Sequence, residues 1–431
     1  MSSDWPVLPL EQCLDALIDY RGKTPEKTEF GVPLVTAKVI KGGRIERPTE
    51  FIATEAYESW MRRGIPRAGD VVLTTEAPLG EVAQLGHERV ALAQRVVTLR
   101  GKAGLLDNAY LRYLLQTEEL QSQLAARATG TTVLGIKQSE LRKVLVQIPP
   151  IDMQRSAASL LASLDNRIAL LRETNATLEA IAQALFKSWF VDFDPVRAKS
   201  QGLAPAGMDE ATAALFPDGF VELTLGLVPK TWETAKLGAE ASYLNRGISP
   251  KYVDVGGVLV INQRCVRDFK VDLSKARRHD DGQRGINGRE LRVGDVLVNS
   301  TGVGTLGRVA QVLTLDARTI VDSHITVVRA GDRLSWNYLG LAMMRRQAEI
   351  EELGEGTTGQ TELNRGKLAG LAFVVPPRKV LEAFDASTLP LRMRLAANSH
   401  QAQTLATLRD TLLPRLISGQ LRLPEAQALI A

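Results

Sequence analysis

The stretch LGEVAQL at residues 79–85 is repeated almost unchanged as LGRVAQV at residues 306–312, 227 residues further along the chain. Self-similarity at one fixed spacing is typical of a chain built from homologous segments. Two more pairs of residues match at the same spacing: Trp5 with Trp232, and Pro149-Pro150 with Pro376-Pro377. The sequence therefore predicts two related halves in a chain of 431 residues, a length that allows two or three domains.

The spacing shortens to 225 residues between these anchors. There RGKTP at residues 21–25 matches RGISP at 246–250, and Gly69-Asp70-Val71 matches Gly294-Asp295-Val296. One short deletion and one compensating insertion account for the change. Because four separate blocks agree, we interpret the two halves as homologous.

A glycine-rich stretch, GVGTLG at residues 302–307, has the spacing of a dinucleotide-binding turn. Such a turn must open a helix whose N-terminus faces the pyrophosphate. The residues that follow, RVAQV at 308–312, alternate as in a strand, and the matching segment of the first half keeps only Gly80 of the three glycines. We therefore expect a turn between two strands rather than a cofactor site.

Each half has the same internal order. A strand-rich stretch, roughly 5–148 in the first half and 232–375 in the second, contains amphipathic helices at Asn108–Leu124 and Trp336–Leu353. A Pro-Pro step then ends the last strand, and a long helix follows. The expected fold class is α+β: two homologous mixed α/β domains separated by a pair of long antiparallel coiled-coil helices, with an internal pseudo-twofold.

The first long helix is expected from about Met153 to Phe190. Asn175 is the polar residue of its seam, where it either fixes the register of a helix pair or marks a solvated kink. The apolar residues of the seam are spaced alternately by three and four, the heptad pattern of packed helices: Leu161, Leu164, Ile168, Leu171, Leu178, Ala182, Leu185 and Trp189.

The second long helix, from Arg378 on, carries a similar seam with Thr388 and Arg409 as departures from it. Pro390 and Pro414 are expected to limit or bend this helix, which leaves its length open. Since each helix leaves an equivalent domain, the two are expected to pair antiparallel. The seam consists of Leu391, Leu395, Asn398, Ala402, Leu405, Leu412 and Leu416.

Composition disfavours several classes of protein. With 53 basic and 49 acidic residues the net charge is only +4, which permits a polyanionic partner without demanding one. Cys13 and Cys265 form no CxxC pair and the four histidines are scattered, so neither a disulfide framework nor a metal site is expected. No nucleophile elbow or phosphate loop is present. We expect a cytoplasmic binding protein, since neither a signal peptide nor an apolar run of ~18 residues is found.

The length of the long helix suggests what is bound. About 36 helical residues at about 1.5 Å each span roughly 54 Å, or roughly 15 base pairs at about 3.4 Å per step. Two related domains at the ends of such a spacer suit two separated patches on duplex DNA, with inverted orientations that match the antiparallel strands. The sequence therefore favours a DNA-binding protein.

Several blocks of the sequence resemble a known family. IPPIDMQR at residues 148–155, LDNRI at 164–168 and especially LFKSWFVDFDPV at 185–196 resemble the first conserved region of specificity subunits of type I restriction-modification systems. LFP at 215–217, followed by VPKTW at 228–232, resembles the segment that leads into their second recognition domain. The resemblance covers essentially the whole chain.

The resemblance implies a non-catalytic subunit that reads a split DNA sequence and docks two adenine methyltransferase subunits. It also implies restriction subunits, which act as an ATP-dependent translocase and nuclease. S-adenosylmethionine is then expected on the methyltransferase and ATP on the restriction partner, with no cofactor in this chain. The implied parts are a first recognition domain at 1–150, a long helix at 151–193, a connector at 194–230, a second recognition domain at 231–377, a long helix at 378–418 and a tail at 419–431.

Candidate DNA contacts lie in matching loops of the two halves. The Arg-Gly-x-Thr/Ser-Pro loop offers an arginine, a hydroxyl and free backbone N–H groups to a phosphate, or is simply a tight turn. The polar residues after Gly-Asp-Val differ between the halves, as two readers of different sequences require, although a solvated loop predicts the same variation. The candidates are Arg21, Lys23, Thr24, Lys38, Lys41, Arg44, Thr74, Thr75 and Glu76, and in the second half Arg246, Ser249, Asn262, Gln263, Arg264, Asn299, Ser300 and Thr301.

Phe186, Trp189 and Phe190 are the candidate partner-binding residues, with packing inside the chain as the alternative. Two other functions stay open. A two-domain enzyme that uses the glycine turn should bind a nucleotide. A stand-alone two-domain DNA-binding regulator without restriction-modification partners should bind specific DNA tightly by itself.

Overall fold

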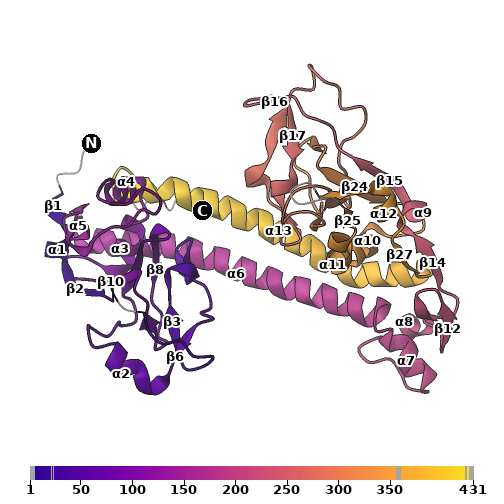
Figure 1. The fold of residues 1–431 in the computed structure, drawn as a ribbon, viewed down its shortest axis with the longest axis horizontal. Coiled ribbons are helices and arrows are strands. Elements are labelled where there is room, and N and C mark those ends of the chain that lie inside the picture. Colours follow the sequence, from indigo (N-terminus) through magenta and orange to yellow (C-terminus); the bar gives the residue numbers. More distant parts are fainter. Residues whose placement is uncertain (1–4, 21, 23, 356–360, 423–424, 427–431) are drawn as a thin grey trace. The chain divides into compact units, whose positions relative to one another are not determined.

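The chain folds into two compact units in the computed structural model. The first unit comprises residues 1–170 and 401–431, and the second comprises residues 171–400. Helices α6 (Ile151–Phe190) and α13 (Arg378–Ile417) each contribute one end to each unit (Figure 1). The structure describes residues 5–20, 22, 24–355, 361–422 and 425–426.

Each unit is built on a four-stranded antiparallel sheet, and the strands follow the same order in both. The order is β2-β10-β7-β8 in the first unit and β15-β24-β21-β22 in the second. Every strand has a counterpart, which confirms the homologous halves. The bounds are Leu14–Asp19, Val96–Gly101, Val71–Thr75 and Leu79–Gln84 in the first sheet, and Ala241–Arg246, Ile325–Ala330, Val296–Asn299 and Val309–Gln311 in the second.

The repeated Gly-Asp-Val segment is explained by a buried ion pair that recurs in both sheets. Asp70 accepts hydrogen bonds from Arg100 Nε at 2.8 Å and Nη2 at 2.7 Å. Asp295 accepts the same two bonds from Arg329, both at 2.7 Å. Bidentate pairs of this kind fix orientation as well as adding energy. The pair therefore fixes the start of β7 and β21, the strands that lead into the predicted DNA-reading loops.

The glycine-rich segment is a turn between two strands, as expected. Gly302, Gly304 and Gly307 have φ values of +105°, +71° and +79°, which side chains other than glycine rarely adopt. The turn joins β21 to β22, and the two strands pair antiparallel. Because a strand and not a helix follows, the N-terminal dipole that a dinucleotide site needs is missing here.

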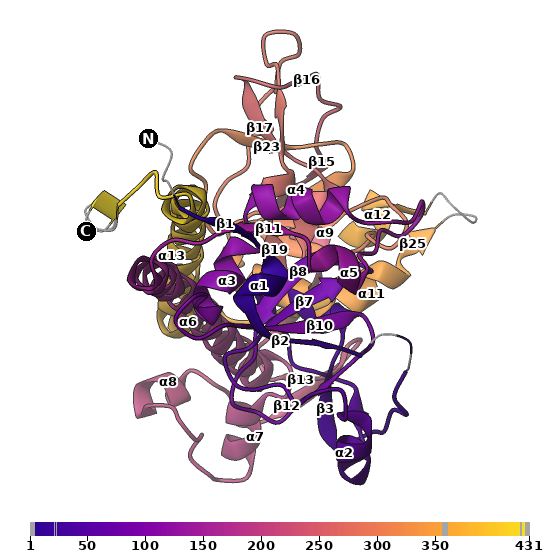
Figure 2. The same ribbon diagram turned by 90° about the vertical axis from the view of Figure 1, so that its left-hand side faces the viewer.

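The remaining elements of the first unit surround its sheet. Tyr110 on α3, Leu161 on α6 and Leu412 on α13 share one buried core. Figure 2 shows these three helices next to one another. These elements are β1 (Val7–Pro9), α1 (Leu10–Cys13), β3 (Val32–Val35), η1 (Ala37–Val39), β4 (Ile40–Lys41), β5 (Arg44–Ile45), β6 (Phe51–Ile52), η2 (Thr54–Ala56), α2 (Tyr57–Trp60), β9 (Ala91–Leu92), α3 (Asn108–Leu114), α4 (Glu118–Ala126), α5 (Gln138–Leu141) and β11 (Leu145–Gln147).

The second unit adds a second four-stranded sheet, with the order β16-β20-β17-β23. Its further elements are α7 (Asp194–Ser200), α8 (Glu210–Ala214), β12 (Phe220–Leu223), β13 (Gly226–Pro229), β14 (Glu233–Lys236), α9 (Leu237–Glu240), β16 (Tyr252–Val253), β17 (Val258–Ile261), η3 (Gln263–Cys265), β18 (Val266–Arg267), β19 (Lys270–Val271), η4 (Leu273–Lys275), β20 (Arg277–His279), β23 (Thr319–Val321), α10 (Trp336–Arg345), α11 (Gln347–Glu352), β25 (Gly354–Glu355), β26 (Glu362–Leu363), α12 (Arg365–Ala369) and β27 (Ala372–Val375).

Each of the two expected amphipathic helices is divided. The predicted helix at Asn108–Leu124 is α3 and α4, and Thr117 caps the second piece by accepting a hydrogen bond from the Leu120 N–H. The predicted helix at Trp336–Leu353 is α10 and α11. Apolar periodicity carries across such breaks, because a short kink keeps the same face on the sheet.

The long helices pack antiparallel, and the polar residues of the seam fix their register in the second unit. The Asn175 Nδ2 donates to the Leu395 carbonyl at 3.1 Å and to the Ser399 hydroxyl at 2.9 Å, while its Oδ1 accepts from Asn398 at 3.0 Å. Asn175 and Asn398 are both buried. The register role of Asn175 is confirmed, and the kink is not found.

The expectation that prolines shorten the second helix is wrong. α13 has 40 residues, as α6 has, and runs through both Pro390 and Pro414. A proline inside a helix removes one hydrogen bond and strains one turn. The buried contacts of α13 on both sides of Pro390, such as Phe384 and Leu395, outweigh that cost.

Within the described residues, no helix is long and apolar enough to cross a lipid bilayer.

Candidate nucleic-acid interface

Asn299 and Ser300, predicted to contact bases, are interior polar groups at the end of β21. Both side chains are fully buried. The Asn299 Nδ2 donates to the Gln263 carbonyl at 3.0 Å, and the hydroxyls of Ser300 and Thr326 lie 2.5 Å apart. Buried amides and hydroxyls need such partners. The two side chains therefore brace the loop and face no open surface.

Thr301 links this loop to the second predicted loop of the same unit. Its half-buried hydroxyl lies 2.7 Å from His324 Nδ1 and 3.3 Å from Gln263 Oε1. Asn262 caps η3 by accepting a hydrogen bond from the Arg264 N–H at 2.9 Å, and the Arg264 side chain is exposed. The structure thus brings residues 262–264 and 299–301 together, with Arg264 exposed and Gln263 and Thr301 half-buried.

Arg246 and Ser249 differ in how accessible their side chains are to a ligand. The Arg246 guanidinium is half-buried, forms an ion pair with Glu362 at 2.5 Å and donates to the Leu363 carbonyl at 3.0 Å. Ser249 is exposed, although its carbonyl accepts from Arg284 at 2.9 Å. Arg246 therefore organises the loop around β26, and Ser249 presents its hydroxyl.

In the first unit, Thr74 and Thr75 are also buried. The Thr74 hydroxyl accepts a hydrogen bond from the Glu81 N–H at 2.9 Å, which ties β7 to β8. Glu76, the next residue, is half-buried and lies 3.5 Å from Arg95 in an ion pair. Of these three candidates only Glu76 reaches the surface.

Lys38, Lys41 and Arg44 of the first unit lie on or next to one short hairpin, β4–β5. Lys38 and Lys41 both reach solvent, and Lys41 pairs with Glu46 at 3.0 Å. Arg44 is half-buried on β5. These basic side chains give the hairpin positive charge, which contacts with DNA phosphates require.

Three candidates belong to the Arg-Gly-x-Thr-Pro loop of the first unit. Thr24 is exposed. Arg21 and Lys23 lie outside the described residues.

Sequence reasoning missed the hairpin that corresponds to β4–β5 in the second unit, β18–β19. Its turn is Asp268-Phe269, whereas the turn of β4–β5 is Gly42-Gly43. Beside the hairpins the charge of one matched residue is reversed, because Glu81 on β8 corresponds to Arg308, the residue directly before β22. An alignment of the two halves of the sequence at these positions indicates the difference between the two hairpins.

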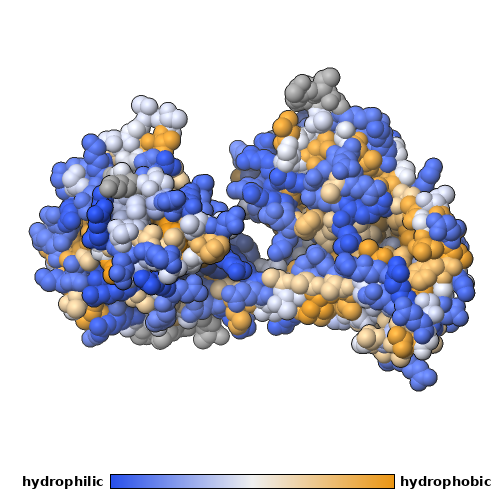
Figure 3. All heavy atoms as spheres, turned by 60° about the horizontal axis from the view of Figure 1, so that its bottom comes forward, coloured by the Kyte–Doolittle hydropathy of each residue, from blue (hydrophilic) through white to orange (hydrophobic). Residues whose placement is uncertain are grey.

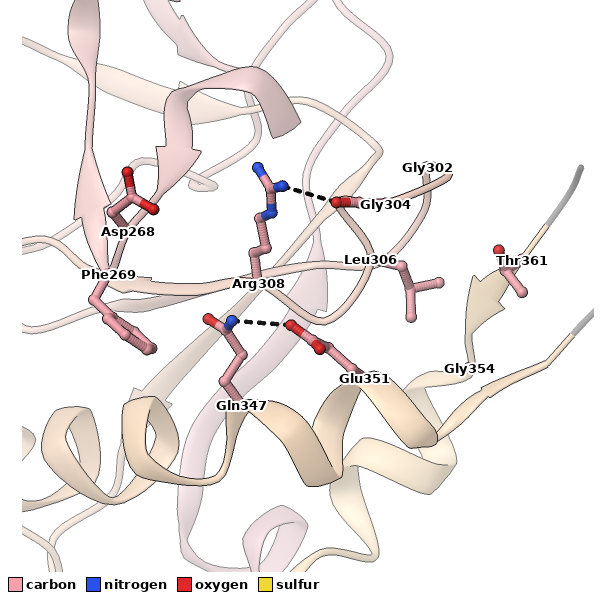
Figure 4. Close-up of a pocket in the computed structure, with 10 residues that line it drawn as sticks. All are labelled: Asp268, Phe269, Gly302, Gly304, Leu306, Arg308, Gln347, Glu351, Gly354 and Thr361. Carbon is pink, nitrogen blue, oxygen red and sulfur yellow. Dashed lines mark hydrogen bonds between the residues drawn. The ribbon is translucent and has the colours of Figure 1, made fainter. Parts of the chain in front are cut away.

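This hairpin borders a cavity of about 510 Å³ (Figure 4). Phe269 lies on one side of the cavity and Glu351 on the other, with Arg308 between them. The Arg308 Nη2 donates to the Gly304 carbonyl at 2.8 Å, and the Gln347 Nε2 donates to Glu351 at 2.9 Å. The cavity is therefore a mixed apolar and charged recess beside the glycine turn.

The candidate partner residues Phe186, Trp189 and Phe190 are packed inside the second unit. Each side chain is only 5–6% exposed. Phe190 lies 4.8 Å from the ring of Phe384 on α13 and 4.9 Å from that of Tyr338 on α10, measured between ring centroids. These rings therefore close the core around the end of α6, which is the alternative reading of the cluster.

Exposed apolar side chains follow directly after this cluster, in the connector. Figure 3 shows apolar patches on the right-hand side of the second unit, the side where Figure 1 places α7 and β12. The apolar connector side chains that are more than one third exposed are Leu203, Val221, Leu223, Leu225 and Leu227, and Val191, which precedes the connector, is exposed as well. A protein in water rarely gathers such residues in one segment without a partner.

The residues that the structure describes include no group of three or more His, Cys, Asp or Glu side chains placed to hold a metal ion. Cys13 and Cys265 are both buried and unpaired with each other.

Comparisons with known proteins place the chain beside one family. Residues 21–180 match the family model described as type I restriction modification DNA specificity domain. The chain is 26% identical to the type I restriction enzyme MjaIX specificity subunit of Methanocaldococcus jannaschii, over 98% of this chain and 94% of the relative. It is 23% identical to the HindI specificity subunit of Haemophilus influenzae, over 78% of this chain and 82% of that one.

A solved structure has the same fold. The S subunit of a type I restriction-modification system from M. genitalium superposes with a TM-score of 0.60 at 14% identity, covering 96% of each chain.

Proposed function

Because this chain belongs to the specificity subunits of type I restriction-modification systems, we propose that each of its two units reads one part of a split DNA target. Specificity subunits are the non-catalytic, target-recognising members of these complexes. One observation carries the proposal: the two units share one scaffold but differ in chemistry at matching surface positions. Glu81 of the first unit occupies the position of Arg308 in the second unit, and the sheets of the two units have the same strand order.

Such a difference suits the reading of two sequences. An arginine pairs well with guanine, and a glutamate accepts a hydrogen bond from cytosine. The buried pairs Asp70–Arg100 and Asp295–Arg329 hold the frame constant, so that the loops vary without loss of the fold. The half-sites of the target are therefore expected to differ from each other.

The exposed candidates supply the contacts with the DNA backbone. Lys38 and Lys41 in the first unit, and Arg264 and Ser249 in the second, reach solvent from the predicted loops. Each cation that neutralises a phosphate contributes about one unit to the slope of log affinity against log salt concentration. Replacement of Lys38 or Arg264 by Gln should therefore lower that slope by about one unit, without changing the preferred sequence.

The docking of methyltransferase subunits is assigned to the exposed apolar connector. Phe186, Trp189 and Phe190 support this surface from beneath rather than touching the partner. The methyltransferase would carry S-adenosylmethionine, and a restriction subunit would carry ATP. Replacement of Leu225 and Leu227 by Asp should weaken co-purification with the methyltransferase. Val255→Asp is the control, because Val255 is 89% exposed outside the connector.

The test of the whole proposal is methylation of DNA. The chain is co-expressed with the methyltransferase encoded beside it, and N6-methyladenine is mapped in the host genome. One split motif methylated on both strands is expected, and exchange of residues 5–148 for those of a relative should change one half of it only. Tight sequence-specific binding by the chain alone, with no methylation in the complex, would instead indicate a stand-alone regulator.

A further inference from the structure

The tip of hairpin β18–β19 holds two non-glycine residues in a conformation that disfavours them. Asp268 and Phe269 have φ values of +50° and +61°. A two-residue hairpin turn with positive φ at both positions prefers Asn-Gly or Gly-Gly. The matching turn of the first unit is Gly42-Gly43, with φ values of +54° and +81°. The second unit thus keeps the backbone of a glycine turn but carries a bulky aromatic residue on it.

Folding does not explain the phenylalanine. Its side chain is 41% exposed, so the ring is not a core residue that offsets the backbone strain by burial. The ring instead borders the cavity that Arg308 and Gln347 also line (Figure 4). Strain retained at an exposed position points to a contact with something outside the chain.

The groups around Phe269 match the edges of DNA bases. Arg308 uses one guanidinium nitrogen for the Gly304 carbonyl, and its side chain lines the cavity together with Phe269 (Figure 4). Arg267 and Lys270 flank the turn, and both are exposed. An apolar ring beside an arginine, with cations at the rim, suits a thymine methyl group next to a guanine in the major groove.

The first unit presents the opposite chemistry at the same place. There Glu81 Oε2 accepts a hydrogen bond from the Gly42 N–H at 2.9 Å, so the carboxylate is tied to the bare hairpin tip. No aromatic ring stands on that turn, because both its residues are glycine. The hairpin tip and the residue beside it therefore differ between the two units in both bulk and charge.

We propose that Phe269 is a specificity-determining residue of the second unit, which contacts a thymine methyl group in its half-site, with Arg308 reading a neighbouring guanine. This inference rests on the proposed function, since it names the base-reading element of one recognition domain. Phe269 determines which base is recognised, and Arg267 and Lys270 contact the phosphate backbone of the DNA.

Two adjacent substitutions separate reading from stability. Asp268→Gly and Phe269→Gly each place glycine at one positive φ, but only Phe269→Gly removes the ring. The complex of full-length chain and methyltransferase is used for both. Asp268→Gly should keep the methylated motif and its rate, whereas Phe269→Gly should relax one position of one half-site. The melting temperature of both variants is measured to show that the fold is intact, and that of Asp268→Gly is expected to be no lower than that of the wild type.

The methyl group itself is tested with synthetic duplexes. Each thymine of the half-site is replaced in turn by deoxyuridine, which lacks only the methyl group. Wild-type affinity should fall by at least about fivefold at one position, and the Phe269→Gly complex should bind both duplexes equally. Arg308→Met should relax discrimination at an adjacent guanine.

Three results overturn the inference: an unchanged motif for Phe269→Gly, equal binding of thymine and uracil duplexes by the wild type, or a half-site without thymine. If the wild-type complex methylates no split motif at all, the proposed function itself fails, and this inference fails with it.

Discussion

Replacement of Asp165 by Asn should weaken the first unit more than its small chemical change suggests. The Asp165 carboxylate is buried between α6 and α13, where it accepts hydrogen bonds from Arg112 at 2.6 Å, Tyr113 at 2.8 Å and Arg409 at 2.8 Å. Asn keeps the shape but removes the charge, which leaves the Arg112 guanidinium without its anion and the Arg409 guanidinium with only the exposed Asp410.

The magnitude follows from the burial of the two arginine partners. Loss of one member of a buried ion pair costs about 3–5 kcal/mol. The side chains of Arg112 and Arg409 are 14% and 23% exposed, so water replaces part of the lost interaction. We therefore expect the free energy of unfolding to fall by about 2–4 kcal/mol at pH 7.

Asp410→Asn is the matched control, because Asp410 pairs with the same Arg409 at 2.7 Å but is 64% exposed. An exposed ion pair contributes less than about 1 kcal/mol. Urea unfolding of the wild type and both variants, followed by circular dichroism, measures the two differences.

The dependence on pH gives a second readout. Burial by itself raises the pKa of Asp165, but hydrogen bonds from Arg409 and Tyr113 and the charge of Arg112 lower it below its ordinary value. A lowered pKa contributes stability that is complete above the unfolded value of about 4 and is lost as the pH falls through the folded value. The gap between wild type and Asp165→Asn should thus be constant from neutral pH to about pH 5 and narrow below about pH 4. A gap that persists unchanged at acid pH, or an Asp410→Asn variant as unstable as Asp165→Asn, would refute this account.

Three other predictions follow from buried polar groups of the second unit. Replacement of both Asn175 and Asn398 by Leu should raise the melting temperature, because the seam becomes apolar. The register of the two helices should loosen at the same time, so that engineered cysteines on α6 and α13 form disulfides with more than one partner position. Arg329→Met should lower the free energy of unfolding by about 3–5 kcal/mol, because the buried Asp295 carboxylate loses its cation. An effect below about 1 kcal/mol in urea unfolding would contradict the structural role of the pair. Burial raises the pKa of Asp322, so ionisation of this carboxyl destabilises the folded state once the pH rises above the pKa of a free aspartate. Asp322→Asn should therefore stabilise the unit at pH 7 and not at pH 4. An equal gain in stability at both pH values would contradict this prediction.

The repeat in the sequence predicted the duplicated sheet because buried strand residues tolerate little change. LGEVAQL at 79–85 and LGRVAQV at 306–312 bury apolar residues on both faces of β8 and β22, since Val82 and Val309 pack in one core of each unit and Ala83 and Ala310 in another. The seam of the long helices was predictable for the same reason, since a heptad pattern follows from helix geometry alone. Asn175 could be identified as a register residue only together with its partner Asn398.

The candidate site was less predictable, because polarity in a sequence does not indicate exposure. Thr74, Thr75, Asn299 and Ser300 carry the side chains expected of base-reading residues, and all four lie inside the fold. Thr74, Ser300 and the Asn299 Nδ2 form hydrogen bonds with neighbouring segments there. The aromatic cluster around Trp189 was uncertain for the opposite reason, because an apolar group suits both a core and an interface.

By itself the sequence determined the two homologous halves, the paired helices with an asparagine in their seam, and the family through its conserved blocks. These features depend on periodicity and on short-range chemistry, which are written along the chain. Only the tertiary structure decided that α13 is uninterrupted by Pro390, that Phe186 and Phe190 close a core, and that Phe269 stands exposed on a strained turn beside Arg308. These depend on which distant segments cover a side chain, and burial is a property of the assembled fold rather than of the residue.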